Sequence, residues 1–164
     1  MRHVIRKLRH AVRRMRPARH PHRFFTRAEE HRIIAAIQHT EHETSGQIRV
    51  HVEGRCPGDA TARAREVFVG IGMHRTARRN GTLIYLATRD RKFAIVGDEG
   101  IHAAVPPGFW EEMRNAMAGE FRCGRFCEGI CHGITAIGHH LKAYFPGQPD
   151  EKNELPDEIS AGAT

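Results

Sequence analysis

Two short apolar runs separated by a polar turn form the most regular hydrophobic pattern in the chain. The first run is Leu83–Leu86 and the second is Phe93–Val96, and each is bounded by a glycine. Continuous apolar runs of this length are typical of strands that are covered on both faces. The four polar residues 88–91 between them are enough to close a hairpin. The pattern therefore predicts a buried β-hairpin within 78–101, followed by a short helix that Asp98 would cap.

A helix is predicted near the start of the folded part. Thr26 and Glu29 have the spacing of a capping box, in which each side chain binds the other residue's backbone amide. Isoleucines at positions 33, 34 and 37 mark the buried face of this helix. We expect it to end near Thr44, with Gly46 as a left-handed cap.

The next residues predict a strand and a crossover helix. Residues 47–53 alternate strictly, with Ile48, Val50 and Val52 on one side and Arg49 and His51 on the other, as in a strand. A core-helix stripe follows over 64–71, after a turn that ends at Asp59. A helical crossover makes the first two strands parallel, with a right-handed connection.

Two further helices are predicted after the hairpin. One begins after Pro106-Pro107 and has an inward stripe of Trp110, Met113, Met117 and Phe121. The other covers about 125–145, with a core face of Cys127, Ile130, Ile134, Ile137 and Leu141. The element order predicts an α/β fold, in which a small mixed β-sheet is sandwiched between α-helices.

Charge divides the 164 residues into three parts. The formal net charge is +7, yet residues 1–27 hold ten Lys and Arg and no acid. The remaining chain has 16 basic and 19 acidic residues, a balance of −3. We therefore expect a basic N-terminal arm over 1–23, an α/β domain over 24–147 and an acidic C-terminal tail over 148–164.

The arm combines charge with a weak apolar stripe. Val4, Leu8, Val12 and Met15 recur at helical spacing among the basic residues. Such a segment can be a disordered solubilising arm, a helix on an anionic membrane surface, a nucleic-acid contact or a transit peptide. The residues that would make the membrane or nucleic-acid contact are Arg2, Arg6, Lys7, Arg9, Arg13, Arg14 and Arg16.

The tail has apolar residues within its acidic sequence. Leu155 and Ile159 are four residues apart around a proline. We expect the tail to fold back on the domain and bury both side chains, while its carboxylates meet basic residues before the hairpin such as Arg75, Arg78 or Arg79. If it does not fold back, a partner-binding peptide is the alternative.

Cysteine and histidine spacing gives no strong metal motif. Cys123, Cys127 and Cys131 are four residues apart and could supply thiolates to zinc, but Cys127 falls in the apolar stripe of its helix, where cysteine acts as a small hydrophobe. His39, His42 and His51 are interpreted as solvated. The chain has no CxxC spacing, no secretory segment and no run of the roughly 18–20 apolar residues that span a bilayer. A reducing, cytoplasmic location is expected, peripheral to a membrane if the arm binds one.

Several stretches resemble one known family. They are TSGQIRVHVEG, RNGTLIYLATRDRKFAIVGDEGI, FRCGRFCEGI, HHLKAYFP and NELPDEIS, in that order over most of 24–160. They are similar to the TPM domain family, named for a thylakoid lumen protein, a photosystem II associated protein and a nematode acetylcholine-receptor modulator, in its short bacterial form. The resemblance implies an α/β fold, and members act as acid phosphatases, calcium binders, or repair and assembly factors.

A phosphatase needs either a nucleophile or a metal cluster. None of the cysteines has an arginine six positions later, and the chain has no DxD motif or Walker loop. Metal-assisted hydrolysis remains, with Asp98 and Glu99 as ligands for Ca²⁺ or another divalent metal, because residues directly after a strand line the ligand crevice of open α/β sheets. The alternative role of Asp98 is the helix cap. Longer family members have an Asp-containing turn ahead of their first helix, and this chain has 22–26, HRFFT, instead.

These observations favour a non-enzymatic interaction or assembly module with an unidentified protein partner, tethered by its arm to an anionic membrane. A divalent-metal-dependent acid phosphatase is the first alternative, and nucleic-acid binding through the arm is the second. Enzymatic activity is left open by the sequence.

Overall fold

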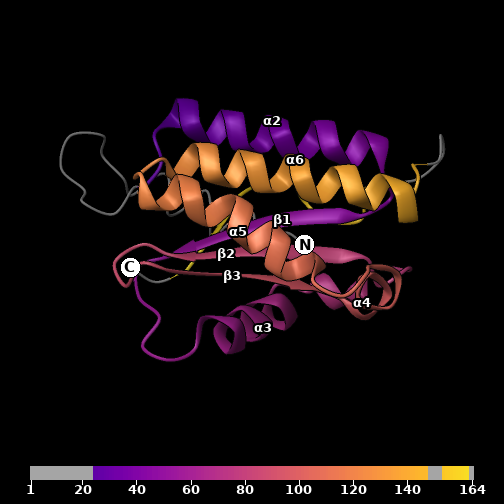
Figure 1. Ribbon diagram of the computed structural model, residues 1–164, viewed down its shortest axis with the longest axis horizontal. Helices are drawn as coiled ribbons and strands as arrows, with labels where there is room; N and C mark the ends of the chain where they lie inside the picture. The colour runs from indigo at the N-terminus through magenta and orange to yellow at the C-terminus, as the bar shows by residue number, and fades with distance from the viewer. Residues whose placement is uncertain (1–23, 148–152, 163–164) are drawn as a thin grey trace.

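The computed structural model describes residues 24–147 and 153–162. Its helices are α2 (Arg27–Glu43), α3 (Ala60–Gly70), the 3-10 helix η1 (Met73–Arg75), α4 (Glu99–Ala104), α5 (Phe109–Arg122) and α6 (Phe126–Tyr144). Its strands are β1 (Gln47–Glu53), β2 (Gly81–Ala87), β3 (Lys92–Gly97) and β4 (Ser160–Ala161). Helices α2, α5 and α6 cover one face of the sheet and α3 covers part of the other (Figure 1). This arrangement confirms the predicted α/β sandwich.

The sheet has the order β3-β2-β1-β4 within the described residues. Strands β1 and β2 are parallel, with Val50 opposite Ile84, and β2 and β3 form the predicted antiparallel hairpin, with Ile84 opposite Ile95. Helix α3 is the crossover that a parallel pair requires. Strand β4 was not predicted, and it pairs in parallel with the outer edge of β1.

Each face of the sheet has its own apolar core. On the α2 and α6 side, Ile48 and Val50 of β1 and Ile84 of β2 pack against the isoleucine stripe of α6. On the α3 side, Leu83 and Tyr85 of β2 pack against α3. Strand β2 is buried along its whole length, because it contributes alternate residues to both cores. This explains why its sequence is continuously apolar.

The predicted helix caps at Thr26 and Asp98 are confirmed, and the predicted cap at Gly46 is corrected. Thr26 and Glu29 form the capping box, Asp59 caps α3 and Asp98 caps α4. Helix α2 ends as expected, with Thr44 as its extended C-cap residue. The prediction that Gly46 is a left-handed cap was wrong, because its φ is not positive. A Cβ atom there would lie 2.8 Å from Leu141 Cδ1, so the glycine allows α6 to pack closely.

The two long C-terminal helices also follow their predicted stripes. Met113 and Met117 of α5 are buried, and Trp110 is half-buried. The core face of α6 is buried, and Cys127 lies within it. A Cβ at Gly138 would lie 2.2 Å from Thr40 Cγ2, so this glycine allows α2 and α6 to pack closely.

The fold-back of the tail is confirmed for residues 153–162. Leu155 is buried in the α3-side core and Ile159 packs against the other core. The carboxylate of Glu154 accepts a hydrogen bond from the Ala77 backbone amide (3.1 Å). Arg79, one of the basic residues expected to meet the tail, pairs with Asp98 and Glu99 instead. This segment completes the sheet of the 24–147 domain.

The basic arm of residues 1–23, with its proposed contact residues Arg2, Arg6, Lys7, Arg9, Arg13, Arg14 and Arg16, lies outside the described residues. Within the described residues, none of the helices has the length and apolar character needed to cross a bilayer.

Candidate functional site

The predicted pair Asp98 and Glu99 lies at the end of the sheet where the parallel strands begin. Strand β3 runs antiparallel to β2, so its last residue, Gly97, is opposite Thr82 near the start of β2. The Asp98 amide donates to the Gly81 carbonyl (2.9 Å). Asp98 does follow a strand, as expected, but β3 runs antiparallel to β2. Asp98 therefore lies at the amino ends of the parallel strands and not at their carboxyl ends, where the ligand crevice was expected.

The Asp98 carboxylate is held by protein groups. Arg79 donates to it from Nε (2.8 Å) and Nη2 (2.9 Å), and the Glu99 amide donates to Asp98 Oδ1 (2.8 Å). Asp98 is 5% exposed, whereas the Glu99 side chain is 81% exposed, with an oxygen 3.7 Å from Arg79 Nη1. The capping role of Asp98 is confirmed.

This geometry does not fit a calcium site as it stands. Calcium binds six to eight oxygens, and here both Asp98 oxygens face a guanidinium. No group of three or more His, Cys, Asp or Glu among the described residues is arranged to hold a metal ion. A metal held by Asp98 and Glu99 stays a prediction, and it requires Arg79 to leave Asp98.

One face of β1 carries a row of polar residues along its whole length, and the sequence pattern did not predict that they are buried together. The residues of β1 that face the α3 side are all polar and all buried, and we call Gln47, Arg49, His51 and Glu53 the β1 row. Helix α3 packs over β2 and β3. The β1 row is covered instead by the C-terminal segment, residues 153–162, whose Leu155 amide donates to Gln47 Oε1 (3.0 Å) and whose Ser160 pairs with His51.

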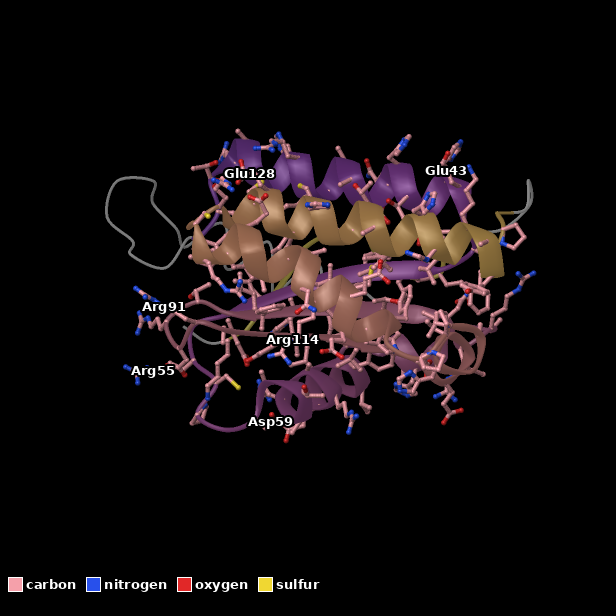
Figure 2. All side chains as sticks on the ribbon, viewed as in Figure 1. Glu43, Arg55, Asp59, Arg91, Arg114 and Glu128 are labelled. Carbon is pink, nitrogen blue, oxygen red and sulfur yellow. The ribbon has the colours of Figure 1, made fainter. Side chains whose placement is uncertain are left out.

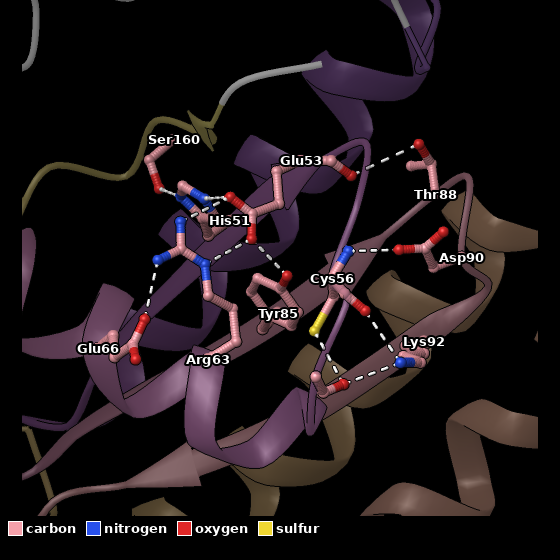
Figure 3. A network of polar contacts seen from close by, with 11 residues as sticks. His51, Glu53, Cys56, Arg63, Glu66, Tyr85, Thr88, Asp90, Lys92 and Ser160 are labelled. Carbon is pink, nitrogen blue, oxygen red and sulfur yellow. Dashed lines mark hydrogen bonds and ion pairs between the residues drawn. The ribbon is translucent and has the colours of Figure 1, made fainter.

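Glu53 is the centre of a polar network (Figure 3). Arg63 of α3 donates to both of its oxygens, from Nε (2.8 Å) and Nη2 (3.0 Å), and the Tyr85 hydroxyl donates to one of them. Burial alone would raise the pKa of Glu53, but the hydrogen bonds from Arg63 and Tyr85 lower it below its ordinary value. Glu53 is therefore an ionised carboxylate closed by its own partners.

His51 connects this network to the C-terminal segment. Its Nδ1 is 2.8 Å from Ser160 Oγ, and its Nε2 is 3.6 Å from a Glu53 oxygen. Burial lowers the pKa of His51, so the imidazole is neutral at physiological pH. The interpretation of His51 as solvated was wrong, because the tail covers it, whereas His39 and His42 are exposed as expected.

Ser160, His51 and Glu53 have the composition of a nucleophilic triad, but their positions favour a structural role. Ser160 is buried, and its hydroxyl also donates to the Val50 carbonyl (3.3 Å). A nucleophile has to reach its substrate and give its proton to the base. The three side chains therefore fix the C-terminal segment to β1.

Arg49 lies at the middle of the β1 row and is 1% exposed. Its Nε has no hydrogen-bond partner, but the guanidinium interacts electrostatically with the carboxyl groups of Glu158, Glu41 and Asp157. Burial lowers the pKa of Arg49, and the three acids oppose that effect. Two of these acids belong to the C-terminal segment, so the tail supplies counter-charge to a buried cation.

Glu41 of α2 lies beside this cation and accepts the Ile48 amide of β1 (2.7 Å). Burial, together with the neighbouring Asp157 carboxyl, raises the pKa of Glu41 to about 9. The side chain is therefore protonated at neutral pH. It satisfies an edge amide of β1 that β4 does not reach.

The loops that follow β1 and β2 form an exposed basic end. Arg55 and Arg91 are exposed and lie at the same end of the molecule (Figure 2). The Asp90 carboxylate accepts the Cys56 amide (2.6 Å), and Lys92 Nζ donates to the Cys56 carbonyl (2.9 Å). These bonds hold the two loops together.

The three C-terminal cysteines differ in environment. Cys123 is exposed, Cys127 is buried and Cys131 is half-buried. Burial raises the pKa of Cys127 to about 12, so its thiol stays protonated. The core interpretation of Cys127 is confirmed.

A family model of the TPM domain matches residues 20–140. The solution structure of the BA42 protein from the psychrophilic bacterium Bizionia argentinensis is 42% identical, with 87% of this chain and 99% of that chain covered and a TM-score of 0.82.

Two more distant solved structures have the same fold. The N-terminal domain of a Porphyromonas gingivalis protein is 17% identical, with 75% of this chain and 80% of that chain covered and a TM-score of 0.61. The N-terminal domain of a Corynebacterium glutamicum protein is 14% identical, with coverages of 86% and 94% and a TM-score of 0.61. No curated protein matches this chain. The family model and the similarity to BA42 together establish that the chain belongs to the TPM domain family.

Proposed function

We propose that this TPM-domain protein is a non-enzymatic interaction module, tethered by its N-terminal arm to an anionic membrane. One observation carries the first part of the proposal. The buried carboxylates at both ends of the sheet, Asp98 and Glu53, are each closed by a two-point contact from an arginine. Neither carboxylate is available to the outside in this arrangement.

Catalysis by either carboxylate would need a group within reach of a substrate. A general base has to approach the proton that it removes, and a metal ligand has to give oxygen lone pairs to the ion. Arg79 and Arg63 occupy those lone pairs, and the exposed Glu99 beside Asp98 is a single carboxylate. Binding a partner needs no such group, and β1 already binds an extended segment of its own chain.

An assay against a generic phosphomonoester tests the proposal. Purified full-length protein is incubated with the substrate and with calcium, magnesium, manganese or no added metal. We expect no hydrolysis above the protein-free rate under any condition, either for the wild type or for the Asp98→Ala variant. The Asp59→Ala variant is a matched control, because Asp59 caps α3 in the same way but lies far along the chain from the Arg79 pair.

Metal-dependent turnover in the wild-type protein and in Asp59→Ala, lost in Asp98→Ala, would contradict the proposal and assign hydrolysis to Asp98. Turnover that Asp98→Ala leaves unchanged would also contradict it, and would place the catalytic groups elsewhere.

A further inference from the structure

The C-terminal segment binds β1 as an added strand. Ser160 and Ala161 pair in parallel with His51 and Val52, and the Gly162 amide donates to the Val52 carbonyl (2.9 Å). Earlier in the segment, the Leu155 amide donates to Gln47 Oε1 (3.0 Å). The segment therefore follows β1 from its first residue to its last.

The segment also matches the chemistry of the β1 row. Two of its three acids, Asp157 and Glu158, interact electrostatically with Arg49, and its hydroxyl at Ser160 meets the imidazole of His51. Its aliphatic Leu155 enters the α3-side core. Gln47, Arg49 and His51 of the row thus each meet a group of complementary character in the segment.

The position after the strand accepts only a very small residue. A Cβ at Gly162 would lie 2.3 Å from Glu53 Oε2 and 3.0 Å from His51 Nε2. Arg63 and Tyr85 hold Glu53 from the other side, so its carboxylate has little freedom to move. The β1 edge therefore selects sequence as well as charge.

We propose that the outer edge of β1, with the β1 row beneath it, is a binding site for an extended acidic segment of a partner protein, and that the chain's own C-terminal segment occupies it when the partner is absent. This inference deepens the proposed interaction function and rests on it. The partner segment would carry an aliphatic residue, then two acids, then a hydroxyl residue followed by small residues.

The chain's own segment makes only a short backbone ladder with β1. Its ladder to β1 is two residue pairs long, and the bond between Asn153 and Asp157 lies within the segment. In strand addition, main-chain hydrogen bonds supply affinity and side-chain pockets supply specificity. A partner segment that forms a longer ladder with β1 would gain affinity from the additional main-chain hydrogen bonds. The internal segment would lower the apparent affinity of the partner, because it occupies the same site.

The test uses the full chain and a fluorescein-labelled peptide with the sequence of residues 153–164. In the Gly162→Ala variant the added Cβ weakens the internal segment, and amide exchange at Leu155 and Gly162 reports its release. We expect the peptide to bind this variant at least tenfold more tightly than the wild-type protein, by fluorescence anisotropy. Gly119→Ala is the matched control, because a Cβ there meets no atom within 4 Å, and it should behave as the wild type.

Two further arms complete the experiment. A peptide in which Asp157 and Glu158 are replaced by Asn and Gln should bind the variant at least tenfold more weakly, because it no longer matches Arg49. If Gly162→Ala leaves amide exchange at Leu155 and Gly162 unchanged, a double variant that combines Gly162→Ala with Leu155→Ala is used to release the segment. Circular dichroism checks that each variant is folded.

A folded variant with a released segment that does not bind the peptide would overturn the inference. Dimerisation of that variant without peptide, by exchange of segments, would overturn the partner assignment and identify a second copy as the occupant. Neither result bears on phosphomonoester turnover, so the failure of this inference is distinguishable from failure of the proposed function.

Discussion

At the scale of single residues, the most unusual feature is the number of charged groups under the tail. A buried arginine is rare unless it is paired, and Arg49 is surrounded by acids from α2 and from the C-terminal segment. Glu41 adds a carboxyl that stays protonated beside Asp157. This arrangement makes the stability of the fold depend on pH.

The Glu41→Gln substitution should remove part of that dependence. The pKa of Glu41 is raised to about 9 in the folded protein, mainly by burial, whereas an unfolded glutamate titrates near 4.5. The folded state therefore holds this proton more tightly, its contribution to stability is complete below pH 4.5, and it is lost as pH rises towards 9. The unfolding free energy of the wild type should fall between pH 7 and pH 9, and that of Glu41→Gln should fall less.

Thermal melts at pH 7, 8 and 9 measure this difference. Burial lowers the pKa of His51 in the folded protein, and an unfolded histidine titrates near pH 6.5, so His51 contributes little to the slope above about pH 7.5. Glu43→Gln, an exposed position on the same helix, is the control and should keep the wild-type slope. Equal slopes in Glu41→Gln and the wild type would show that Glu41 is ionised in the folded protein.

At the scale of elements, helices and strands with a full hydrophobic period were predictable. The alternation of 47–53, the two runs of the hairpin and the stripe of α6 each repeat often enough to define a face. Strand β4 has two residues, which is too short for any period, and its pairing depends on contacts more than 100 residues away in sequence. Its signal was limited to the two aliphatic residues of the tail.

The interface between α2 and α6 gives a prediction at this scale. The Gly138→Ala substitution places a Cβ 2.2 Å from Thr40 Cγ2, so the helices must separate or the threonine must move. Overpacking of this kind costs about 1–3 kcal/mol, partly offset by about 1 kcal/mol from the better helix propensity of alanine. We expect a net loss of up to about 2 kcal/mol in unfolding free energy, measured by urea denaturation.

Gly119→Ala on α5 is the counterpart, because its Cβ meets no atom within 4 Å and the gain in helix propensity is unopposed. It should stabilise the protein by up to about 1 kcal/mol. The expected signs are opposite for the same chemical change. A gain at both positions would mean that the two helices are not packed as closely as described.

At the scale of the whole molecule, the sequence predicted the layers better than the sites. Asp98 and Glu99 were correctly placed after a strand and before a helix, but pairing with Arg79 depends on the left-handed backbone at that arginine and on the antiparallel direction of β3. Within the β1 row, His51 was interpreted as solvated from the sequence. In the structure α3 packs over β2 and β3, and residues 153–162 lie against β1 and cover His51. Two features together could have indicated that the β1 row is covered. Every residue of β1 on that face is polar, and the chain ends in an acidic tail that contains aliphatic residues.

The N-terminal arm carries the last prediction, because its charge and the charge of the domain can be tested together. Residues 1–27 hold ten basic residues, and Arg55 and Arg91 project from one end of the folded part. Each basic residue near an anionic membrane contributes about 1 kcal/mol of attraction, which salt screens. Full-length protein should cosediment with phosphatidylserine-containing vesicles at low salt, and a chain starting at Phe24 should remain in the supernatant.

Further comparisons separate the contributions of the apolar stripe, the arm and the folded domain to vesicle binding. Replacing Val4, Leu8, Val12 and Met15 by serine keeps the charge and removes the apolar stripe, so weaker pelleting of this variant would assign part of the affinity to insertion. A full-length double variant with Arg55→Ala and Arg91→Ala tests whether the folded domain contributes to vesicle binding in addition to the arm. Equal pelleting of full-length protein and the chain from Phe24 would exclude the arm as the anchor, and stronger binding to RNA than to vesicles at matched salt would make nucleic acid its partner, because phosphate charge attracts the same residues.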